Sequence, residues 1–208
     1  MDMDQKLSFL ALGDSYTIGE SVDENERWPN LLVKTCKEKG INFASPHIIA
    51  KTGWTTDELN HAIDDANIDD TYDWVSLLIG VNNQYRGRSV DDYKPEFESL
   101  LKRAISYAND KKEHVFVLSI PDWGVTPFAH DRDRNAIARE IDAYNLANRQ
   151  IAEKYQVQYF DITPSTRKAA DDLSLLAPDG LHPSGKNYLQ WAEMVAEWVV
   201  LKTQKSSM

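Results

Sequence analysis

The fold is decided near the start of the chain, by the stretch LSFLALGDSY that covers residues 7–16. Its first six residues are largely apolar, as in a strand that is buried on both faces of a parallel sheet. They lead directly into Gly13-Asp14-Ser15, a small polar turn that places a hydroxyl at the end of the strand. A buried parallel strand that ends in polar residues predicts an α/β protein with a site at the carboxyl edge of its sheet.

The rest of the chain alternates short apolar runs with amphipathic helical patterns. The apolar runs predict four further strands, at residues 43–50, 74–80, 114–120 and 157–162. Apolar residues at helical spacing predict helices around residues 28–40, 55–63, 93–108, 137–155 and 188–199. This alternation predicts a three-layer α/β/α sandwich around a five-stranded parallel sheet. We expect one domain over residues 1–208, with residues 202–208 as a loose tail.

Composition and charge narrow the classes of partner. The formal net charge is -10, so phosphates would be repelled, and we expect neither nucleic acid nor an anionic membrane as a partner. The only cysteine, Cys36, excludes an intrachain disulfide and fits a reducing compartment; on its apolar helix face it is interpreted as a small buried residue. The N-terminus is acidic and the apolar run at residues 7–12 is short, which predicts a cytoplasmic protein without a signal peptide or membrane span.

Five polar or small residues follow the predicted strands. Ser15, Gly53 and Asn82 come directly after the first three strands, and Asp179 and His182 follow the fifth strand and a short helical connection. Since parallel strands end at the same edge of the sheet, we expect these residues to converge. A serine becomes nucleophilic when a neutral imidazole accepts its proton, and a carboxylate holds that imidazole in the required tautomer. The set predicts acyl transfer, with Ser15 as nucleophile, His182 as base and Asp179 as the orienting acid.

An acyl-transfer site also needs donors aimed at the oxyanion of the tetrahedral intermediate. The backbone amides of Ser15 and Gly53 and the side-chain amide of Asn82 are the candidates. The lack of a Cβ at Gly53 would let the backbone approach a ligand closely.

These blocks, in this order, resemble those of the SGNH hydrolase superfamily, the GDSL-type lipases and esterases. The resemblance rests on Gly13–Ser15, Gly53, Gly80–Asn82 and Asp179–His182, which together span most of the chain. It implies a flavodoxin-like sheet of order 2-1-3-4-5 and no metal or other cofactor. It also implies that Ser15, Gly53, Asn82 and His182 are the named site residues, with Asp179 completing the triad.

Two positions separate this chain from related patterns. Asn83 stands where an aspartate is common in the family, which puts one contact behind Asn82 in doubt. Thr17 stands where the nucleophile elbow of α/β-hydrolases has its second glycine.

Asp131-x-Asp133-x-Asn135 resembles the start of a calcium-binding loop, but the residues at the later positions of that loop do not match the motif. We therefore expect no metal site.

Each residue alone also fits a structural role. Ser15 could cap a helix, Asn82 could form a turn, and Asp179 with Gly180 could be an ordinary turn before a surface His182. Four aromatic residues that follow the strands could line an acyl or sugar pocket, or equally pack in the core or anchor loops: Trp54, Tyr85, Trp123 and Phe128.

The combination predicts a hydrolase of small carboxylic esters that works through an acyl-enzyme on Ser15. A deacetylase of O-acetylated sugars, a thioesterase and a lysophospholipase would use the same machinery. The alternative outside enzymes is a non-catalytic module that binds a small ligand.

Overall fold

Five parallel strands form the central sheet of the computed structural model, which describes residues 6–205. They are β1 (Phe9–Gly13), β2 (His47–Ala50), β3 (Trp74–Leu78), β4 (Val115–Leu118) and β5 (Gln158–Phe160). Their order in the sheet is β2-β1-β3-β4-β5, and every neighbouring pair is parallel. The predicted fold class and strand order are therefore confirmed.

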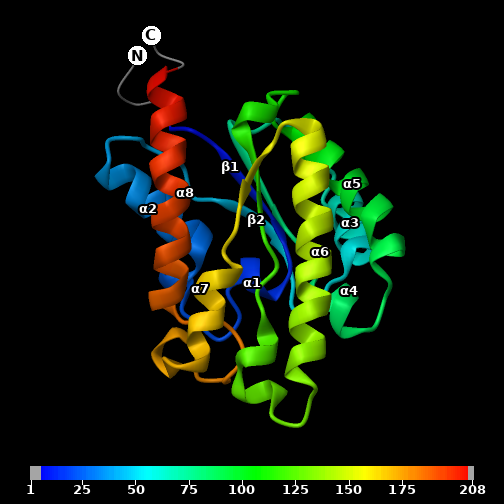
Figure 1. Ribbon diagram of the computed structural model, residues 1–208. Helices are drawn as coiled ribbons and strands as arrows, with labels where there is room; N and C mark the ends of the chain where they lie inside the picture. Colours follow the sequence, from blue (N-terminus) through cyan, green and yellow to red (C-terminus); the bar gives the residue numbers. More distant parts are fainter. Residues whose placement is uncertain (1–5, 206–208) are drawn as a thin grey trace.

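Helices cover both faces of this sheet (Figure 1). Helices α2 (Trp28–Glu38) and α8 (Gly185–Lys205) pack together on one side. On the other side lie α3 (Thr56–Asp65), α5 (Val90–Tyr107) and α6 (Arg134–Tyr155). Three short helices sit in the connections, namely α1 (Ser15–Ile18), α4 (Val81–Tyr85) and α7 (Thr163–Arg167). Single 3₁₀ turns occupy Glu24–Glu26, Lys112–His114, Trp123–Val125, Pro127–Ala129, Lys168–Ala170 and Leu173–Leu175.

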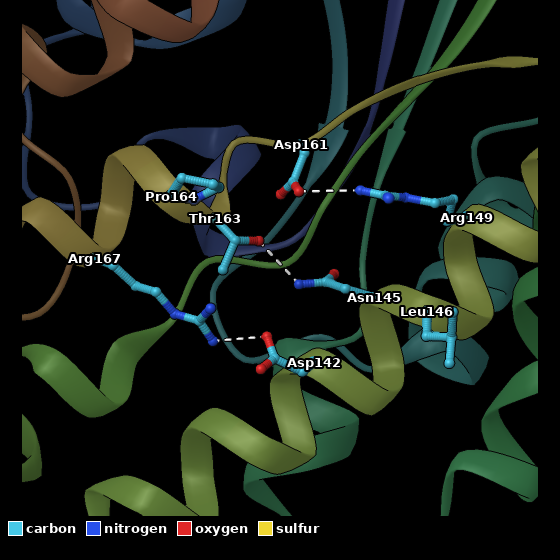
Figure 2. Close-up of a pocket in the computed structure, with 8 residues that line it drawn as sticks. All are labelled: Asp142, Asn145, Leu146, Arg149, Asp161, Thr163, Pro164 and Arg167. Carbon is cyan, nitrogen blue, oxygen red and sulfur yellow. Dashed lines mark hydrogen bonds and ion pairs between the residues drawn. The ribbon is translucent and has the colours of Figure 1, made fainter.

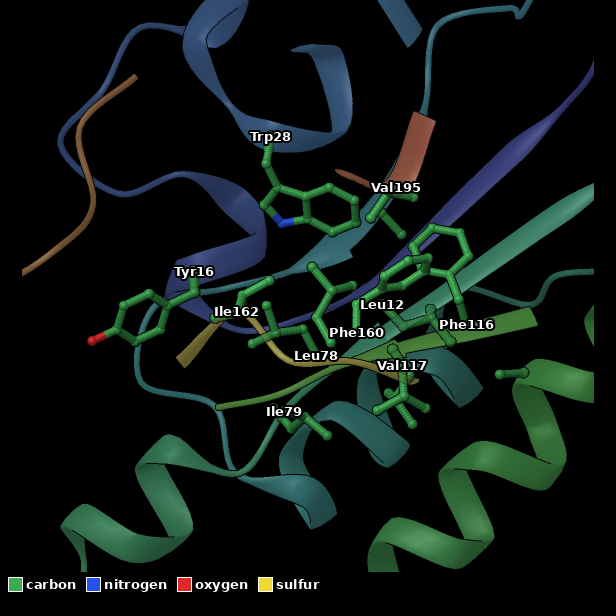
Figure 3. Packing of buried hydrophobic residues seen from close by; sticks show 14 of the residues in the cluster. Leu12, Tyr16, Trp28, Leu78, Ile79, Phe116, Val117, Phe160, Ile162 and Val195 are labelled. Atoms are coloured by element: carbon green, nitrogen blue, oxygen red, sulfur yellow. The ribbon is translucent and has the colours of Figure 1, made fainter. Parts of the chain in front are cut away.

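The core lies between the sheet and its helices. Strands β1 and β3 are buried along their whole length, as their apolar runs predict. Figure 3 shows Trp28 of α2 packed over the sheet beside Phe116 of β4, with ring centroids 6.4 Å apart. Burial of one such large side chain contributes about 1.5–3 kcal/mol, so these aromatic contacts fix α2 against the sheet.

Local capping explains where two helices begin. Thr55 and Glu58 form the capping box that the sequence predicts at the start of α3. Helix α5 begins earlier than predicted, because the Ser89 hydroxyl accepts a hydrogen bond from the Asp92 amide and caps it there. Pro95 consequently lies inside the helix, beyond its first turn.

The predicted loose tail is wrong over residues 202–205, because α8 continues to Lys205. The Thr203 hydroxyl donates to the Val199 carbonyl at 2.9 Å, and the Lys202 ammonium lies 5.8 Å from the centre of the Trp198 ring. The acidic N-terminus and the end of the tail, residues 1–5 and 206–208, lie outside the described residues. Between residues 6 and 205, no helix has the length and apolar character that crossing a membrane requires.

Candidate active site

Ser15 is the first residue of α1 and directly follows the turn at the end of β1. Gly13 has no room for a side chain, since a Cβ there would lie 2.1 Å from the Thr17 hydroxyl. Asp14 caps the short helix, because its Oδ1 accepts a hydrogen bond from the Tyr16 amide at 3.0 Å. The cap at this turn is therefore Asp14, and the Ser15 side chain lines a pocket instead.

His182 and Asp179 form a hydrogen-bonded pair, with Nδ1 of the imidazole 2.6 Å from Oδ2 of the carboxylate. The other oxygen, Oδ1, accepts hydrogen bonds from the backbone amides of Leu181 and His182, both at 3.0 Å. Gly180 has a φ of 66°, which permits the tight turn between them. A carboxylate on Nδ1 assigns the proton to that nitrogen and leaves Nε2 as the acceptor, which is the tautomer that a general base needs.

The electrostatics around Asp179 keep it ionised. Its burial disfavours the charged form, but hydrogen bonds from His182, Leu181 and Ser21 outweigh burial and lower the pKa of Asp179 to about 2.

The carboxyl of Asp14 is in a different environment from that of Asp179, because Asp14 is completely buried. Burial raises the pKa of the Asp14 carboxyl to about 7, against the opposing effect of the Tyr16 amide. Within residues 6–205, Oδ2 of Asp14 is buried with no hydrogen-bond partner.

Gly53 and Asn82 follow the two strands that flank β1, and both line the pocket that contains Ser15. Gly53 has a φ of 88°, a conformation that favours glycine. The backbone angle is the stronger reason for glycine here, because a Cβ would meet only the Arg86 guanidinium at 4.0 Å. Asn82 lies in α4, and its side-chain nitrogen donates a hydrogen bond to the Trp54 carbonyl at 3.0 Å.

Asn83 fills the position behind Asn82 with contacts of its own. Its Oδ1 accepts a hydrogen bond from the Thr56 amide at 3.1 Å, and its Nδ2 donates to the Thr56 hydroxyl at 2.7 Å. That hydroxyl in turn donates to the Glu96 carboxylate. The departure from aspartate therefore keeps a link to the start of α3, with Glu96 as the acceptor for the threonine proton.

The pocket has a volume of about 160 Å³ and an aromatic wall. Tyr85 stands 5.3 Å from Trp123 and 6.3 Å from Phe128, measured between ring centroids. Tyr85 and Phe128 are roughly half exposed, whereas Trp123 is buried and donates from its indole nitrogen to Gln84. The complete lining is Ser15, Tyr16, Thr52, Gly53, Val81, Asn82, Tyr85, Trp123, Phe128, Leu181 and His182.

Trp54 is absent from this lining. Its side chain is partly buried against the hydrophobic core, and its carbonyl oxygen is the group that contacts Asn82. Its place in the site is therefore a backbone contact, whereas the other three predicted aromatic residues present their rings to the pocket.

A second pocket, of about 220 Å³, lies between α6 and α7, and its polar groups are already paired (Figure 2). Arg149 pairs with Asp161 at 3.0 Å, and Arg167 pairs with Asp142 at 2.7 Å. Arg167 also binds the buried Asp122 at 2.8 Å, which anchors the turn that carries Trp123. We therefore interpret this pocket as structural support for the aromatic wall.

Several lining residues carry no signal in the sequence. Tyr16, Thr52, Val81 and Leu181 are neighbours of the predicted residues, so adjacency to a motif was the only clue to them. Tyr16 contacts the base directly, with its ring centroid 5.1 Å from that of His182. The site thus brings a serine, an imidazole–carboxylate pair and three candidate amide donors to one apolar pocket, which is the set of groups that acyl transfer requires.

Comparison with known proteins gives one family and a set of related folds. The model of the GDSL-like lipase/acylhydrolase family matches residues 11–189. No curated protein matches the chain significantly.

Among solved structures, TesA has a TM-score of 0.71 at 18% identity, covering 94% of this chain and 98% of its own. The psychrotrophic esterase EstA from Pseudoalteromonas sp. has a TM-score of 0.71 at 16% identity, covering 97% and 100%. Axe2, an acetylxylan esterase from Geobacillus stearothermophilus, has a TM-score of 0.68 at 19% identity, covering 96% of each chain. At these identities the likeness shows a shared fold.

Proposed function

The chain belongs to the GDSL-like lipase/acylhydrolase family and is an ester-bond hydrolase, and from this premise we propose that it cleaves neutral carboxylic esters through an acyl-enzyme on Ser15. The observation that carries the proposal is the 2.6 Å contact between His182 and Asp179 in the wall of the pocket that Ser15 lines. Hydrolysis of esters by such a set needs no group beyond these side chains and water.

In the first half-reaction, the Ser15 hydroxyl oxygen attacks the ester carbonyl carbon while Nε2 of His182 accepts the hydroxyl proton. The carbonyl oxygen becomes an oxyanion, and the amides of Ser15, Gly53 and Asn82 are the donors that face it. The intermediate then collapses, the bond to the alcohol oxygen breaks, and His182 returns its proton to that oxygen. Alcohol leaves, and the acyl group remains on Ser15.

The second half-reaction repeats these steps with water. His182 accepts a proton from the water molecule, whose oxygen attacks the acyl carbon. Collapse of the second intermediate breaks the bond to Ser15, and His182 returns the proton to the serine oxygen. Asp179 stays ionised throughout, since hydrogen bonds outweigh its burial and lower its pKa to about 2, and it stabilises the imidazolium formed in each half.

The lining supports a neutral substrate. No Asp, Glu, Lys or Arg side chain lines the pocket. A charged group near the ester would enter this pocket without a counter-charge, which is costly.

A second candidate is an esterase of O-acetylated carbohydrates. The half-exposed rings of Tyr85 and Phe128 favour it, because aromatic faces pack against the apolar faces of sugar rings. The fold shared with the acetylxylan esterase Axe2 is compatible with it.

Labelling and turnover test the proposal together. A phosphonofluoridate should attach to the parent protein, and Ser15→Ala should fold normally, bind no label and hydrolyse nothing. A panel of chromogenic acyl esters, acetylated sugars, thioesters and lysophospholipids then separates the alternatives by kcat/KM. Labelling of the Ser15→Ala protein at unchanged stoichiometry would refute the nucleophile, and absence of hydrolysis across the panel would favour a binding module.

A further inference from the structure

Ser21, in the segment that follows α1, contacts Asp179, the acid of the proposed triad. The Ser21 hydroxyl donates a hydrogen bond to Oδ2 of Asp179 at 2.8 Å, over a sequence separation of 158 residues. Resting on the function proposed above, we infer that Ser21 is a positioning residue that orients Asp179 and sets how strongly it holds the proton on His182.

The hydroxyl completes the hydrogen bonding of the Asp179 carboxylate. Oδ1 accepts from the backbone amides of Leu181 and His182, which belong to the turn itself. Oδ2 accepts from the His182 imidazole and from Ser21. Ser21 is thus the one donor to this carboxylate, among the described residues, that comes from outside the Asp179–His182 turn, and it ties that turn to the segment that follows the nucleophile.

The backbone at Ser21 indicates that its position is held by its surroundings. Ser21 has a φ of 63°, in the left-handed region where residues other than glycine are uncommon. Such a conformation persists when neighbouring contacts over-determine it. Glu20, the preceding residue, accepts a hydrogen bond from the Thr52 hydroxyl, beside Gly53. The segment therefore contacts the oxyanion side of the pocket through Glu20 and the base side through Ser21.

The charge on Asp179 determines in which direction loss of the Ser21 hydroxyl should move the pH–activity profile. A hydrogen bond to a carboxylate draws off part of its negative charge, so Asp179 attracts the imidazolium less strongly when Ser21 donates to it. Loss of the hydroxyl should concentrate charge on Oδ2 and stabilise protonated His182. The acidic limb of the pH–activity profile should then move to higher pH. Because Ser21 is exposed, water replaces part of the lost bond, and the shift should be modest.

Other ionisable groups surround the pair without bonding to it. The Tyr16 ring contacts His182. Besides Asp179, three further carboxyls raise the pKa of Tyr16 or of Tyr188 in α8 through their charge. These carboxyls are Asp14, Glu20 and Asp122. Within residues 6–205, the Ser21 hydroxyl donates to Asp179 and to none of these three carboxyls, so loss of the hydroxyl acts on the pair through Asp179.

The test compares Ser21→Ala with Ser21→Gly. Both remove the hydroxyl, but glycine also relieves the left-handed backbone, so a shift common to both isolates the hydrogen bond from the backbone effect. We expect the midpoint of the acidic limb of kcat/KM to rise by roughly half a pH unit in both variants, with the plateau changed less than about threefold. In an Asp179→Asn background, Ser21→Ala should produce no shift, because the carboxylate that it modulates is gone.

A readout independent of turnover accompanies the kinetics. The NMR titration of the His182 ring should move in the same direction in both Ser21 variants, and it is measurable even if no ester is hydrolysed. Failure of Ser15→Ala to abolish activity would count against the proposed function and leave this titration intact. Midpoints equal to the parent in both variants, by kinetics and by NMR, would overturn the role of Ser21, as would an equal shift in the Asp179→Asn background.

Discussion

The side-chain amide of Asn82 is held by the backbone carbonyl of Trp54, with 3.0 Å between Nδ2 and the oxygen. A primary amide has two hydrogens, so this bond fixes the plane of the amide and leaves the second N–H as a donor. Strand β3, which precedes Asn82, pairs with β1, which precedes Ser15. The orientation of the donor is thus set before substrate arrives, which is the condition for efficient stabilisation of an oxyanion.

Replacement of Asn82 should mainly affect turnover. We expect Asn82→Ala to lower kcat by a factor on the order of 10²–10³ with KM little changed, because the donor acts mostly in the transition state. Asn82→Asp should be worse, since a carboxylate would repel the oxyanion. Steady-state kinetics measure both effects after thermal unfolding has established that each variant folds. A kcat within about threefold of the parent would mean that Asn82 only forms a turn.

The base and its orienting acid should differ in severity. We expect Asp179→Asn to lower kcat by a factor on the order of 10⁴. His182→Ala should lose at least as much activity, because the imidazole transfers the proton and the carboxylate only orients the imidazole. In the parent, kcat/KM should rise with pH as His182 becomes neutral. A profile that is flat from acidic to neutral pH would contradict this role, and so would full inhibition by a chelator.

The aromatic wall should set substrate preference. Phe128→Ala should raise KM for esters of ring-bearing alcohols by roughly 2–10-fold, with a smaller effect on methyl esters of the same acid, because a ring contact contributes about 0.5–1.5 kcal/mol. Leu173→Ala is the matched control, since this exposed apolar side chain lies outside the pocket lining. Equal effects on ring-bearing and methyl esters would show that Phe128 does not recognise the substrate ring.

Asp14 should make stability depend on pH. Its folded-state pKa is raised to about 7, so between the usual carboxyl value and pH 7 the folded state binds a proton that the unfolded state lacks. The free energy of unfolding should therefore fall as pH rises through this window. Asp14→Asn, which mimics the protonated acid, should flatten that dependence. Denaturant unfolding from pH 4 to pH 8 measures it, and parallel curves for parent and variant would refute the shifted pKa.

Much of the architecture could be predicted because buried strands have a plain signature. The apolar runs identify all five strands, but the runs at 74–80, 114–120 and 157–162 extend past the ends of their strands. The reason is that residues such as Ile79 and Ile120 remain buried after the ladder has ended. The short helix α4 is not predicted, since its five residues are too few to show a period. Helix α7 lies in the short helical connection that the sequence predicts after the fifth strand.

Some residues of the site could likewise be predicted from the sequence, and others could not. Ser15, Gly53, Asn82 and His182 could be proposed from the sequence because each follows a strand or belongs to a compact motif. The side-chain direction of Trp54 could not, because it depends on the backbone turn at Gly53. Ser21 could not either, since its partner lies 158 residues away and no local pattern links the two.

The uncharged lining of the pocket has a consequence for what happens after hydrolysis. Cleavage of a neutral ester creates a carboxylate anion where no Lys or Arg lines the wall. The lining therefore offers the anion no Lys or Arg as a counter-charge, and a net charge of -10 on the protein favours its escape into solvent. The pocket that binds an uncharged ester should therefore release the carboxylate product readily, and product inhibition should be weak. Inhibition by the product should become stronger as salt screens the repulsion between the anion and the protein.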